Sequence, residues 1–559
     1  MLSYECSGIV QAGGLGEAVR GLASTLAGDY HQRVTVLLPG HGRQHDQSIR
    51  ETYGLQEETQ FIAHGYRLGT NGVRYRFTSG AERGARDGVE FLLVKGLDDM
   101  TSRWLDDRQL YDHDLTLEKM ALFSRTVKLY SEFLLSMHRQ NDLPDLIHAN
   151  DWHMVPAAVA VRQSLMERGM RVPLVFTVHL LSRTSLPWHY ASEDWCGIKD
   201  MPQPLSTVGK RVQSLTYRRV WEGLCRGSLE KFGCFEADYV TSVSKSYLVH
   251  DVIDYVGASI KRRSGHIYNG CDWDPQQIRS TALGEENEPM RSQTGASGMN
   301  RWDLRSFLLT QAIARVSSVF ETDGLKTIRP FETDGPMVLM TGRLSSQKGV
   351  DLLLDSVPRV KEAIPNVRFV LFLLPSGDRD EMHSITDAGS DYPDNVRILF
   401  AQHRPTYLLS YSAADVFAMP SRSEPFGISA LEAMITGNPV VGTNVGGISE
   451  TVLDIEEYGN KGTGILVPSN DARALADSLT SILWMMRVDE QTLLGEAEPS
   501  NLAKGVPVKS VAQMVSQNHR SGSMIRENCR SRVEQNFRWK NAGQTAVDRY
   551  HSAMTSSRF

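Results

Sequence analysis

The sequence predicts an α/β protein made of two doubly wound units in series, each a parallel sheet covered by helices. Short β-branched runs alternate with amphipathic helical patterns, which is typical of parallel βαβ units. The alternation starts afresh after about residue 335. The length of 559 residues, at ~150 residues per domain, also suits more than one domain.

The predicted strands form two series, and each strand is a short apolar run bounded by turn residues or by a helical pattern. The first series covers 34–38, 88–95, 145–148, 174–178 and 239–243. The second series covers 337–340, 367–374, 396–400, 416–419, 439–441 and 464–467. We therefore predict an N-terminal domain over residues 1–275 and a C-terminal domain over residues 336–535.

Two stretches interrupt this pattern. Residues 276–335 are predicted to be an irregular linker, because 281–300 is polar and Phe-Glu-Thr-Asp-Gly at 320–324 is copied at 331–335. A five-residue copy indicates a small local duplication, whereas a repeat fold needs a sustained period. Residues 488–520 are also polar and are interpreted as an insertion.

The charge balance limits the classes of partner. There are 60 Lys plus Arg residues and 66 Asp plus Glu residues, so the net charge is −6. A value this close to neutral argues against nucleic acid or a membrane surface as partner. A local basic cleft for a small anion remains compatible with it.

The cysteines and the apolar segments indicate a cytoplasmic protein. The six cysteines are dispersed with no Cys-x-x-Cys pair, which suits neither a zinc site nor a disulfide scaffold and favours free thiols in a reducing compartment. The apolar stretch 369–374 is far shorter than the ~20 residues that span a bilayer. The N-terminus lacks the pattern of a secretory signal.

Two Gly-Gly turns are candidates for holding phosphate. Gly13-Gly14 follows a short strand of about residues 1–5 and opens a helix with a regular apolar face. A helix that starts after two glycines offers free backbone N–H groups at the positive end of its dipole, and glycine allows close approach. A plain tight turn is the alternative. Gly446-Gly447, also before a helix, is the second candidate.

Two strand ends carry polar clusters at the edge of a parallel sheet where ligands bind. The strand at 145–148 runs into His148, Asp151 and His153, and the next strand ends at His179. A metal site is one interpretation, although no fourth ligand is evident. A helix cap by Asn150 or Asp151 is another. For His179 the alternative is a histidine with satisfied hydrogen bonds.

Arg343 and Lys348 follow the strand 337–340, five residues apart, and precede a helix. Two cations at a strand end suit a diphosphate, because arginine donates two parallel hydrogen bonds and lysine adds a point charge. Prepositioned cations also stabilise the charge that a leaving diphosphate gathers. A solvated pair of surface cations is the alternative.

Glu424 and Glu432 lie eight residues apart across a junction between a loop and a helix. Pro425 and Gly427 disfavour helix before the junction, so Glu424 is expected in the loop and Glu432 on the helix. Two carboxylates so placed suit the hydroxyl groups of two sugars, a hexose and a ribose. For Glu432 a solvated helix face is the alternative.

Six motifs in one order make the sequence resemble the glycogen and starch synthases, glycosyltransferases of the GT-B fold, and most closely the compact archaeal-type members. The motifs extend over both predicted domains. They are Gly13-Gly14-Leu15-Gly16, His148 to His153, Phe176 to His179, Asn269-Gly270-Cys271-Asp272, Gly342 to Gly349, and Glu424 with Glu432.

The resemblance implies two Rossmann-like domains facing a cleft, the first on the acceptor side and the second binding a nucleotide sugar, with 536–559 crossing back to the first. It implies transfer of glucose, with retention, from ADP-glucose or UDP-glucose to the non-reducing end of an α-1,4-glucan. The nucleotide sugar is a substrate, and neither a cofactor nor a metal is expected.

Site residues follow from the same resemblance. Catalytic roles are expected for Glu424, His179, Asp151, Arg343 and Lys348. Donor binding is expected from Gly13, Gly14, Arg343, Lys348, Glu432, Gly446 and Gly447. Contacts to the acceptor or to glucose are expected from His153 and Asn269.

One departure and several alternatives remain. The loop lysine of the family is replaced by Gln11, which bears on the donor contact at that corner. Another GT-B transferase with a small-molecule or lipid acceptor, and a non-catalytic glucan-binding relative, are the alternatives. A dinucleotide dehydrogenase needs Gly-x-Gly-x-x-Gly, a spacing that Gly13 to Gly16 does not provide. The sequence does not choose between ADP-glucose and UDP-glucose, and it leaves a homo-oligomer open.

Overall fold

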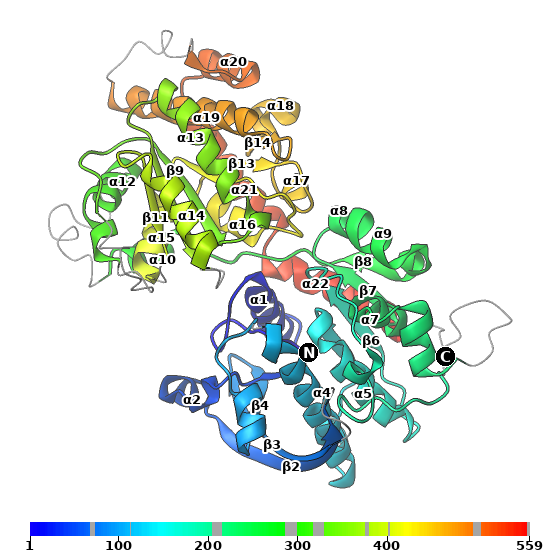
Figure 1. The fold of residues 1–559 in the computed structure, drawn as a ribbon. Coiled ribbons are helices and arrows are strands. Elements are labelled where there is room, and N and C mark those ends of the chain that lie inside the picture. Colours follow the sequence, from blue (N-terminus) through cyan, green and yellow to red (C-terminus); the bar gives the residue numbers. More distant parts are fainter. Residues whose placement is uncertain are drawn as a thin grey trace. The chain divides into compact units, whose positions relative to one another are not determined.

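The chain folds into two units in the computed structural model (Figure 1). Unit 1 comprises Met1–Asn269 with Trp539–Phe559, and unit 2 comprises Gly270–Arg538. The structure describes all residues except 68–72, 112, 204–214, 285–298, 317–328, 375–378, 401–402, 496–504 and 556–559.

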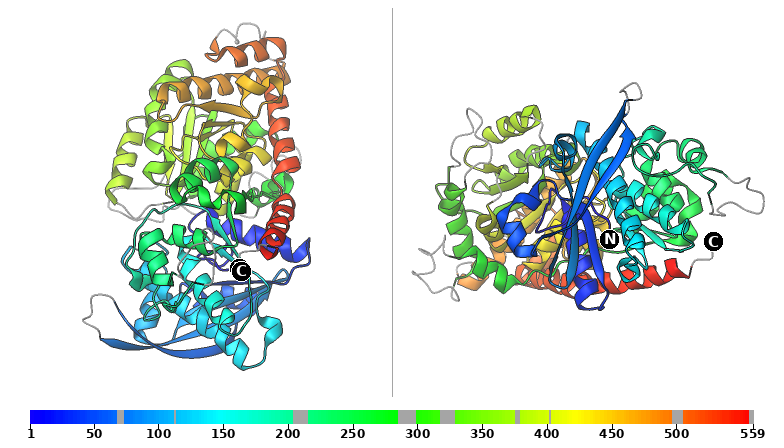
Figure 2. Two further views of the ribbon diagram at one scale, coloured as in Figure 1. Left: turned by 90° about the vertical axis from the view of Figure 1, so that its right-hand side faces the viewer. Right: turned by 90° about the horizontal axis from the view of Figure 1, so that it is seen from below.

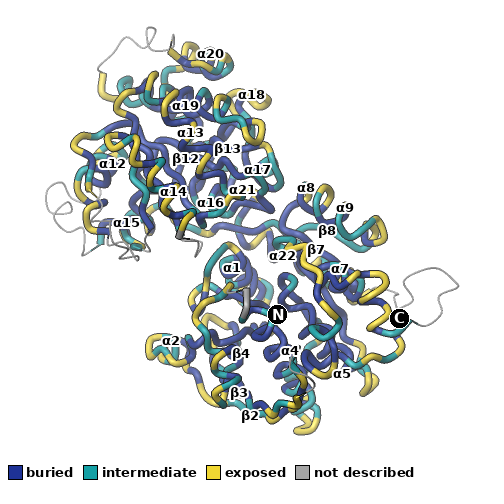
Figure 3. The backbone as a smooth tube through the Cα atoms, viewed as in Figure 1, coloured by how far each residue is buried: buried dark blue, intermediate teal, exposed yellow. Residues whose placement is uncertain are grey.

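Unit 2 contains a six-stranded parallel sheet in the order β11-β10-β9-β12-β13-β14. Its strands are β9 (Met337–Arg343), β10 (Arg368–Leu374), β11 (Val396–Leu399), β12 (Val416–Met419), β13 (Val440–Thr443) and β14 (Gly464–Val467). Helices cover both faces of such a sheet, so its strands are nearly continuous apolar runs. Figure 3 shows the strands of this unit buried and the outer turns of its helices exposed.

Helices connect these strands and pack around them (Figure 1). They are α10 (Pro275–Ala282), α12 (Arg301–Thr310), α13 (Val350–Ala363), α14 (Arg379–Ser390), α15 (Arg404–Ala413), α16 (Ile428–Ile435), α17 (Ile448–Thr451), α18 (Ile455–Tyr458), α19 (Ala472–Leu494), α20 (Lys509–Gln517) and α21 (Ser521–Asn536).

The prediction of an irregular linker over 276–335 was wrong where α10 and α12 lie, because both helices belong to unit 2. Helix α12 begins with a capping box, in which the Asn300 side chain accepts from Asp303 N and the Asp303 side chain accepts from Asn300 N. It buries an apolar stripe of Leu304, Phe307 and Leu308. Similarly, α19 and α20 occupy part of the predicted insertion 488–520.

Unit 1 has two groups of four strands that the N-terminal segment connects. One group is ordered β1-β4-β3-β2 and the other, all parallel, β5-β6-β7-β8. Leu2 forms parallel bridges to Leu37 and to Ala149, which belong to different groups. The strand expected over residues 1–5 is thus reduced to bridges at one residue.

The unit 1 strands include a long antiparallel hairpin that the sequence analysis missed. It comprises β2 (Gln56–Tyr66) and β3 (Arg74–Arg86), visible as long blue ribbons in Figure 2. These strands are rich in polar residues, because β2 is an edge strand with much of its surface exposed. The other strands are β1 (Val34–Pro39), β4 (Val89–Gly96), β5 (Ile147–Asn150), β6 (Leu174–Val178), β7 (Tyr239–Ser242) and β8 (Ser264–His266).

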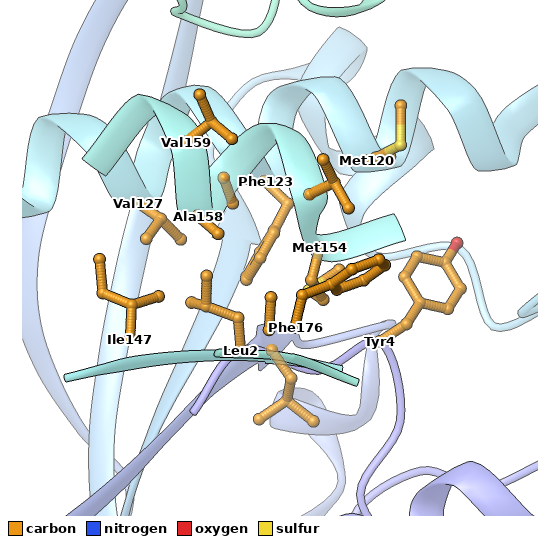
Figure 4. Packing of buried hydrophobic residues seen from close by; sticks show 14 of the residues in the cluster. Leu2, Tyr4, Met120, Phe123, Val127, Ile147, Met154, Ala158, Val159 and Phe176 are labelled. Carbon is orange, nitrogen blue, oxygen red and sulfur yellow. The ribbon is translucent and has the colours of Figure 1, made fainter. Parts of the chain in front are cut away.

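The core of unit 1 lies between these strands and their helices. Figure 4 shows Phe123 and Val127 of one helix and Ala158 of another above Leu2 and Phe176. The helices are α1 (Gly14–Gly28), α2 (Gln47–Tyr53), α3 (Asp99–Leu105), α4 (His113–Ser136), α5 (Val155–Met166), α6 (Tyr217–Arg219), α7 (Leu229–Glu236), α8 (Lys245–Tyr247), α9 (Ile253–Val256) and α22 (Trp539–Met554).

The C-terminal helix α22 packs into unit 1 by specific contacts. Trp539 lies against Gly21 of α1 so closely that a Cβ there would come within 2.0 Å of its ring. The Tyr550 hydroxyl lies 2.8 Å from His148 Nδ1. These contacts explain why the last helix belongs to the first unit, to which the chain returns at Trp539.

Two findings bear on the predicted environment of the chain. The six cysteines are all buried free thiols. In the part of the chain that the structure describes, no helix combines the length and the apolar character that crossing a bilayer requires.

Candidate active site

The strand order of unit 2 marks where a ligand would bind. Strands β9 and β12 are neighbours at the centre of the sheet, and the chain winds from them in opposite directions. In open α/β sheets ligands bind outside the carboxyl ends of the strands at such a reversal. Arg343 is the last residue of β9, Lys348 lies in the turn that follows this strand, and the loop after β12 carries Glu424. The topology therefore brings these predicted residues to one edge.

Lys348 and Glu424 form an ion pair at this edge. Lys348 Nζ lies 2.5 Å from Glu424 Oε2, and the two side chains are 19% and 8% exposed. The Ser421 hydroxyl donates a second hydrogen bond to Glu424 Oε2, at 3.3 Å. A charge pair this far from water is held more strongly than a surface pair. The alternative of a solvated pair of surface cations is therefore wrong for Lys348.

Further contacts tie the two loops together. Arg422 donates to both carboxylate oxygens of Asp351, at 2.9 and 2.6 Å, and to Ser346 O at 2.6 Å. Gln347 Nε2 donates to Ser423 O at 2.8 Å. These bonds link residues about 70 positions apart and hold the backbone on both sides of the Lys348–Glu424 pair.

Arg343 is half-buried, as Lys348 is. Unlike Lys348, its side chain makes no hydrogen bond or ion pair with any residue that the structure describes. Gly342, just before it, has φ 150°, and among the described residues Lys348 carbons are the only side-chain atoms within 4 Å of a Cβ built there. The described residues therefore leave space around this turn. The free guanidinium is available to an anion.

The Gly446-Gly447 turn supports Glu424. Gly447 N donates to Glu424 O at 2.9 Å. Gly446 has φ 47°, and a Cβ there would lie 1.9 Å from the same oxygen. The turn thus requires glycine for close packing against the backbone of Glu424. Because its N–H group is used, Gly447 does not offer the free donor that the sequence analysis expected.

Glu432 lies on α16 beside two tyrosines of α15. Its Oε2 accepts from Tyr411 Oη at 3.2 Å and from Tyr407 Oη at 3.4 Å. Tyr411 Oη also lies 2.7 Å from the Thr341 hydroxyl of β9. The side chain of Glu432 is half-buried, so the alternative of a solvated helix face is wrong.

In unit 1 the Gly13-Gly14 loop is held by a buried glutamate. Glu5 Oε2 accepts from Ala12 N at 2.6 Å and from Gly13 N at 3.1 Å, and Glu5 Oε1 accepts from the Tyr111 hydroxyl. The N–H of Gly13 is therefore not free for a phosphate. Gly14 opens α1, and its N–H has no partner among the described residues. Gln11 donates to Gly13 O at 3.1 Å.

Asp151 follows β5 in a strained conformation, with φ 67°. Strain of this kind clusters at functional sites. Its Oδ1 accepts from Leu180 N at 3.3 Å, beyond the end of β6. Burial raises the pKa of Asp151 from 3.8 to about 8, although the Leu180 N–H opposes the shift. The carboxyl group is therefore protonated in mildly acidic solution.

We expect this shift to make the stability of unit 1 depend on pH. The folded state keeps a proton that the unfolded chain releases above pH 3.8, so the contribution of Asp151 falls as pH rises from about 4 to about 8. Asp151→Asn removes the titrating carboxyl group and keeps a residue that tolerates positive φ. As pH rises over this range, the free energy of unfolding of the variant minus that of the wild type should increase by up to ~1.4 kcal/mol per pH unit.

Denaturation curves at several pH values measure this difference. Asp87→Asn is the matched control, because Asp87 also has positive φ, 53°, but its side chain is 60% exposed. The control should follow the wild type at every pH. Parallel pH profiles for Asp151→Asn and the wild type would contradict the assignment.

His179 lies half-buried at the end of β6 and contacts the end of β5. Its Nε2 lies 3.1 Å from Asn150 Oδ1. Asn150 donates through Nδ2 to Leu2 O at 3.2 Å, so its Oδ1 faces His179 and accepts the Nε2 hydrogen. Burial lowers the pKa of His179 to about 3, so the ring is neutral at pH 7 and leaves Nδ1 as an acceptor.

The other histidines of this cluster have structural surroundings. His148 lies between the Tyr550 hydroxyl and the Thr177 hydroxyl, at 2.8 and 2.6 Å. His153 is buried between the rings of Tyr4 and Trp152, at centroid distances of 4.4 and 3.7 Å. Its two ring nitrogens have no partner among the described residues. Burial lowers the pKa of both histidines to about 3.

These placements do not form a metal centre. His148 and His153 face different partners, and no cluster of three or more His, Cys, Asp or Glu that could hold a metal ion exists among the described residues. Asn269 is nearly buried at the last position of unit 1, where its side chain has no hydrogen bond within the described part of the chain.

Glu5, Arg422 and the two tyrosines beside Glu432 were not predicted from the sequence. A buried acid in the apolar segment before the Gly-Gly loop is the signal that could have identified Glu5. The signal for Arg422 is weaker, because its partner Asp351 lies in a different loop-to-helix segment, 71 residues away.

Two families of known proteins match the chain in series. The model described as the starch synthase catalytic domain matches residues 1–255, and the one described as glycosyl transferases group 1 matches residues 323–491. The glycogen synthase of Exiguobacterium sibiricum is 25% identical over 483 residues, which cover 85% of this chain and 89% of that protein. The glycogen synthase of Alkalilimnicola ehrlichii is 26% identical over 483 residues, covering 84% and 87%.

Solved structures match over the whole chain. The catalytic domain of starch synthase IV from Arabidopsis thaliana, bound to ADP and acarbose, has a TM-score of 0.67 at 18% identity and covers 99% of this chain and 98% of its own. Sucrose-phosphate synthase from Thermosynechococcus elongatus has a TM-score of 0.54 at 19% identity and covers 100% and 98%. At these identities the structural matches carry the fold alone.

Proposed function

Since this chain belongs to the glycogen and starch synthase family of GT-B glycosyltransferases and is a hexosyltransferase, we propose that it adds α-1,4-linked glucose to the non-reducing end of a glucan. The donor is ADP-glucose or UDP-glucose, and the anomeric configuration is retained. The observation that carries this proposal is the Lys348–Glu424 pair at the central edge of the unit 2 sheet, together with Arg343, whose guanidinium has no partner among the described residues.

The geometry of this edge suits a nucleotide diphosphate sugar. The free Arg343 guanidinium donates to the diphosphate, and the Lys348 ammonium, with three N–H groups, donates to it while retaining Glu424. As the bond between glucose and diphosphate breaks, both cations stabilise the charge on the leaving group. Glu424 accepts from glucose hydroxyls, and Glu432 accepts from the ribose hydroxyls. The ADP bound to the Arabidopsis starch synthase supports a nucleotide diphosphate as the ligand class.

Unit 1 supplies the residues proposed to act on the acceptor and the reacting carbon. Neutral His179 accepts a hydrogen bond through Nδ1, and protonated Asp151 donates one. Asn269 offers an amide that has no hydrogen-bond partner among the described residues. His153 fits a contact role less well, because it is buried between two rings. Its effect is proposed to be the support of the loop around Asp151.

The proposal needs no metal and no resident cofactor, and it names only the nucleotide-glucose donor and the α-glucan as partners. We further propose a cytoplasmic location, supported by six buried and unpaired thiols, the state that a reducing compartment maintains.

The test is incorporation of labelled glucose into glycogen, with ADP-glucose and UDP-glucose offered separately. We expect incorporation from at least one donor and almost none in Glu424→Gln. Release of the label by an α-1,4-specific hydrolase checks the linkage and the retained configuration. Glu450→Gln, a half-buried glutamate at the short helix α17, is the matched control and should keep the activity.

Each other outcome points elsewhere. Donor hydrolysis or binding without incorporation into glycogen would replace the glucan by another acceptor, such as a small molecule or a lipid. Absence of both binding and incorporation with either donor would contradict the proposed substrate class altogether.

A further inference from the structure

We propose that a pocket on unit 1 binds a saccharide chain at a site that shares no residue with the candidate active site. The pocket has a volume of about 710 Å³ and is lined by two segments, 185–194 and 218–227. This size lies within the range of small-molecule binding pockets. Its aromatic wall and its balanced charges identify the class of ligand.

The aromatic wall is built from two tryptophans. Trp221 is 1% exposed, and its Nε1 donates to Leu186 O at 3.1 Å, so the indole is fixed. Trp188 packs edge-on against it at a centroid distance of 6.1 Å and is half-buried. An indole that is held from behind and partly open offers a rigid apolar surface for the C–H face of a sugar ring.

The two segments are fastened to each other, so the pocket exists before a ligand arrives. Leu186 N donates to Gly227 O at 2.9 Å, and the Ser185 hydroxyl donates to Arg226 O at 2.7 Å. Gly227 has φ 75°, and a Cβ there would lie 2.4 Å from Leu186 O. A preformed site loses less conformational entropy on binding than one that must order itself.

The charged groups of the pocket cancel. Arg218 Nε donates to Glu222 Oε1 at 2.8 Å, and these two neutralise each other. Asp194 and Arg226 are exposed, and neither side chain makes a hydrogen bond or an ion pair with a described residue, although the Asp194 carboxylate lies near enough to His189 to interact with it electrostatically. One free carboxylate and one free guanidinium suit a neutral ligand with many hydroxyl groups. A phosphorylated ligand would need a net positive pocket.

The identity of the saccharide as an α-glucan rests on the proposed function, whereas the pocket itself does not. The segment that begins just after His179 continues into the pocket. Leu180 N donates to Asp151, Ser182 N and Arg183 N donate to Glu230, and Ser185 starts the lining. A chain of several sugars fits such an extended surface better than a single sugar does. The pocket would then hold a glucan apart from its reacting end.

The experiment measures binding of the full chain to glycogen by affinity electrophoresis and to maltoheptaose by titration calorimetry. Trp188→Ala removes the stacking surface, and we expect affinity to fall about five- to tenfold. Asp194→Ala removes an exposed carboxylate without touching the fold, and we expect about a threefold loss. Tyr458→Ala removes an aromatic ring of unit 2 that is 45% exposed, and it should bind as the wild type does.

The outcomes separate this pocket from the proposed function. Equal affinities for the wild type, Trp188→Ala and Asp194→Ala would overturn the pocket. So would absence of binding to both saccharides. If Trp188→Ala fails to fold, Asp194→Ala decides. Glucose transfer measured on the same preparations tests the function, and its failure beside pocket-dependent binding would overturn the function and leave the pocket standing.

Discussion

Lys348→Ala should lower kcat/KM for glucose transfer by about 100- to 1,000-fold, the range seen when one prepositioned charge stabiliser is removed. The ammonium lies 2.5 Å from Glu424, and its loss removes one of the two cations proposed for the leaving diphosphate. It also leaves Glu424, 8% exposed, without its ion-pair partner. Steady-state kinetics with both nucleotide-glucose donors measure the effect.

The control is Lys461→Ala, which removes the same charge from an exposed position of unit 2 and should leave kcat/KM within twofold. Lys348→Arg keeps the charge with a different shape and should recover part of the loss. The melting temperature of each variant shows whether the loss comes from unfolding. Equal activity of Lys348→Ala and Lys461→Ala would contradict the role of Lys348.

The parallel strands could be predicted from the sequence, because a strand buried on both faces is a continuous apolar run. β6 at 174–178 and β12 at 416–419 were predicted to the residue. The β2–β3 hairpin could not, because its exposed edge strand carries polar residues such as those of Gln56 to Gln60. A strand that is buried on one face alone lacks the continuous apolar run on which the prediction of a strand depends.

The candidate site could be predicted residue by residue but not as an arrangement. Arg343, Lys348 and Glu424 were identified from their chemistry and from a resemblance to known motifs. Their meeting depends on β9 and β12 being neighbours, and this order follows from packing of the whole sheet, which no local pattern encodes. The hydrogen bond from Gly447 N to Glu424 O could not be predicted either, because it joins two loops that are separate in the sequence.

Helix α12 was predicted to be part of an irregular linker, and the partners of its buried arginine lie in distant segments of the chain. Its Arg305 is 6% exposed, and the guanidinium contacts Asp334, Asp415 and Glu490 at 2.9, 2.9 and 3.3 Å. Asp415 in turn accepts from Met337 N, the first residue of β9, at 2.9 Å. A helix within the predicted irregular linker 276–335 thus fastens the start of the central strands.

Arg305→Met should therefore lower the free energy of unfolding of unit 2 by about 3 kcal/mol, because removing one partner of a buried ion pair leaves the other without compensation. Asp415 is 2% exposed and would keep a single cation, Arg526 at 3.2 Å, beside its hydrogen bond from Met337 N. Hydrogen exchange of the β9 and β12 amides measures the change in that unit without requiring a single unfolding transition for the whole chain.

The control is Arg359→Met, whose arginine is 44% exposed and pairs with Asp477 at 2.6 Å. An exposed pair contributes about 0–1 kcal/mol, so this variant should differ little from the wild type. Arg305→Met combined with Asp415→Asn should be less destabilised than the sum of the single changes, because the second change removes the uncompensated charge. Additive effects, or equal losses in Arg305→Met and Arg359→Met, would show that α12 is held by its apolar stripe and that its buried charges contribute little.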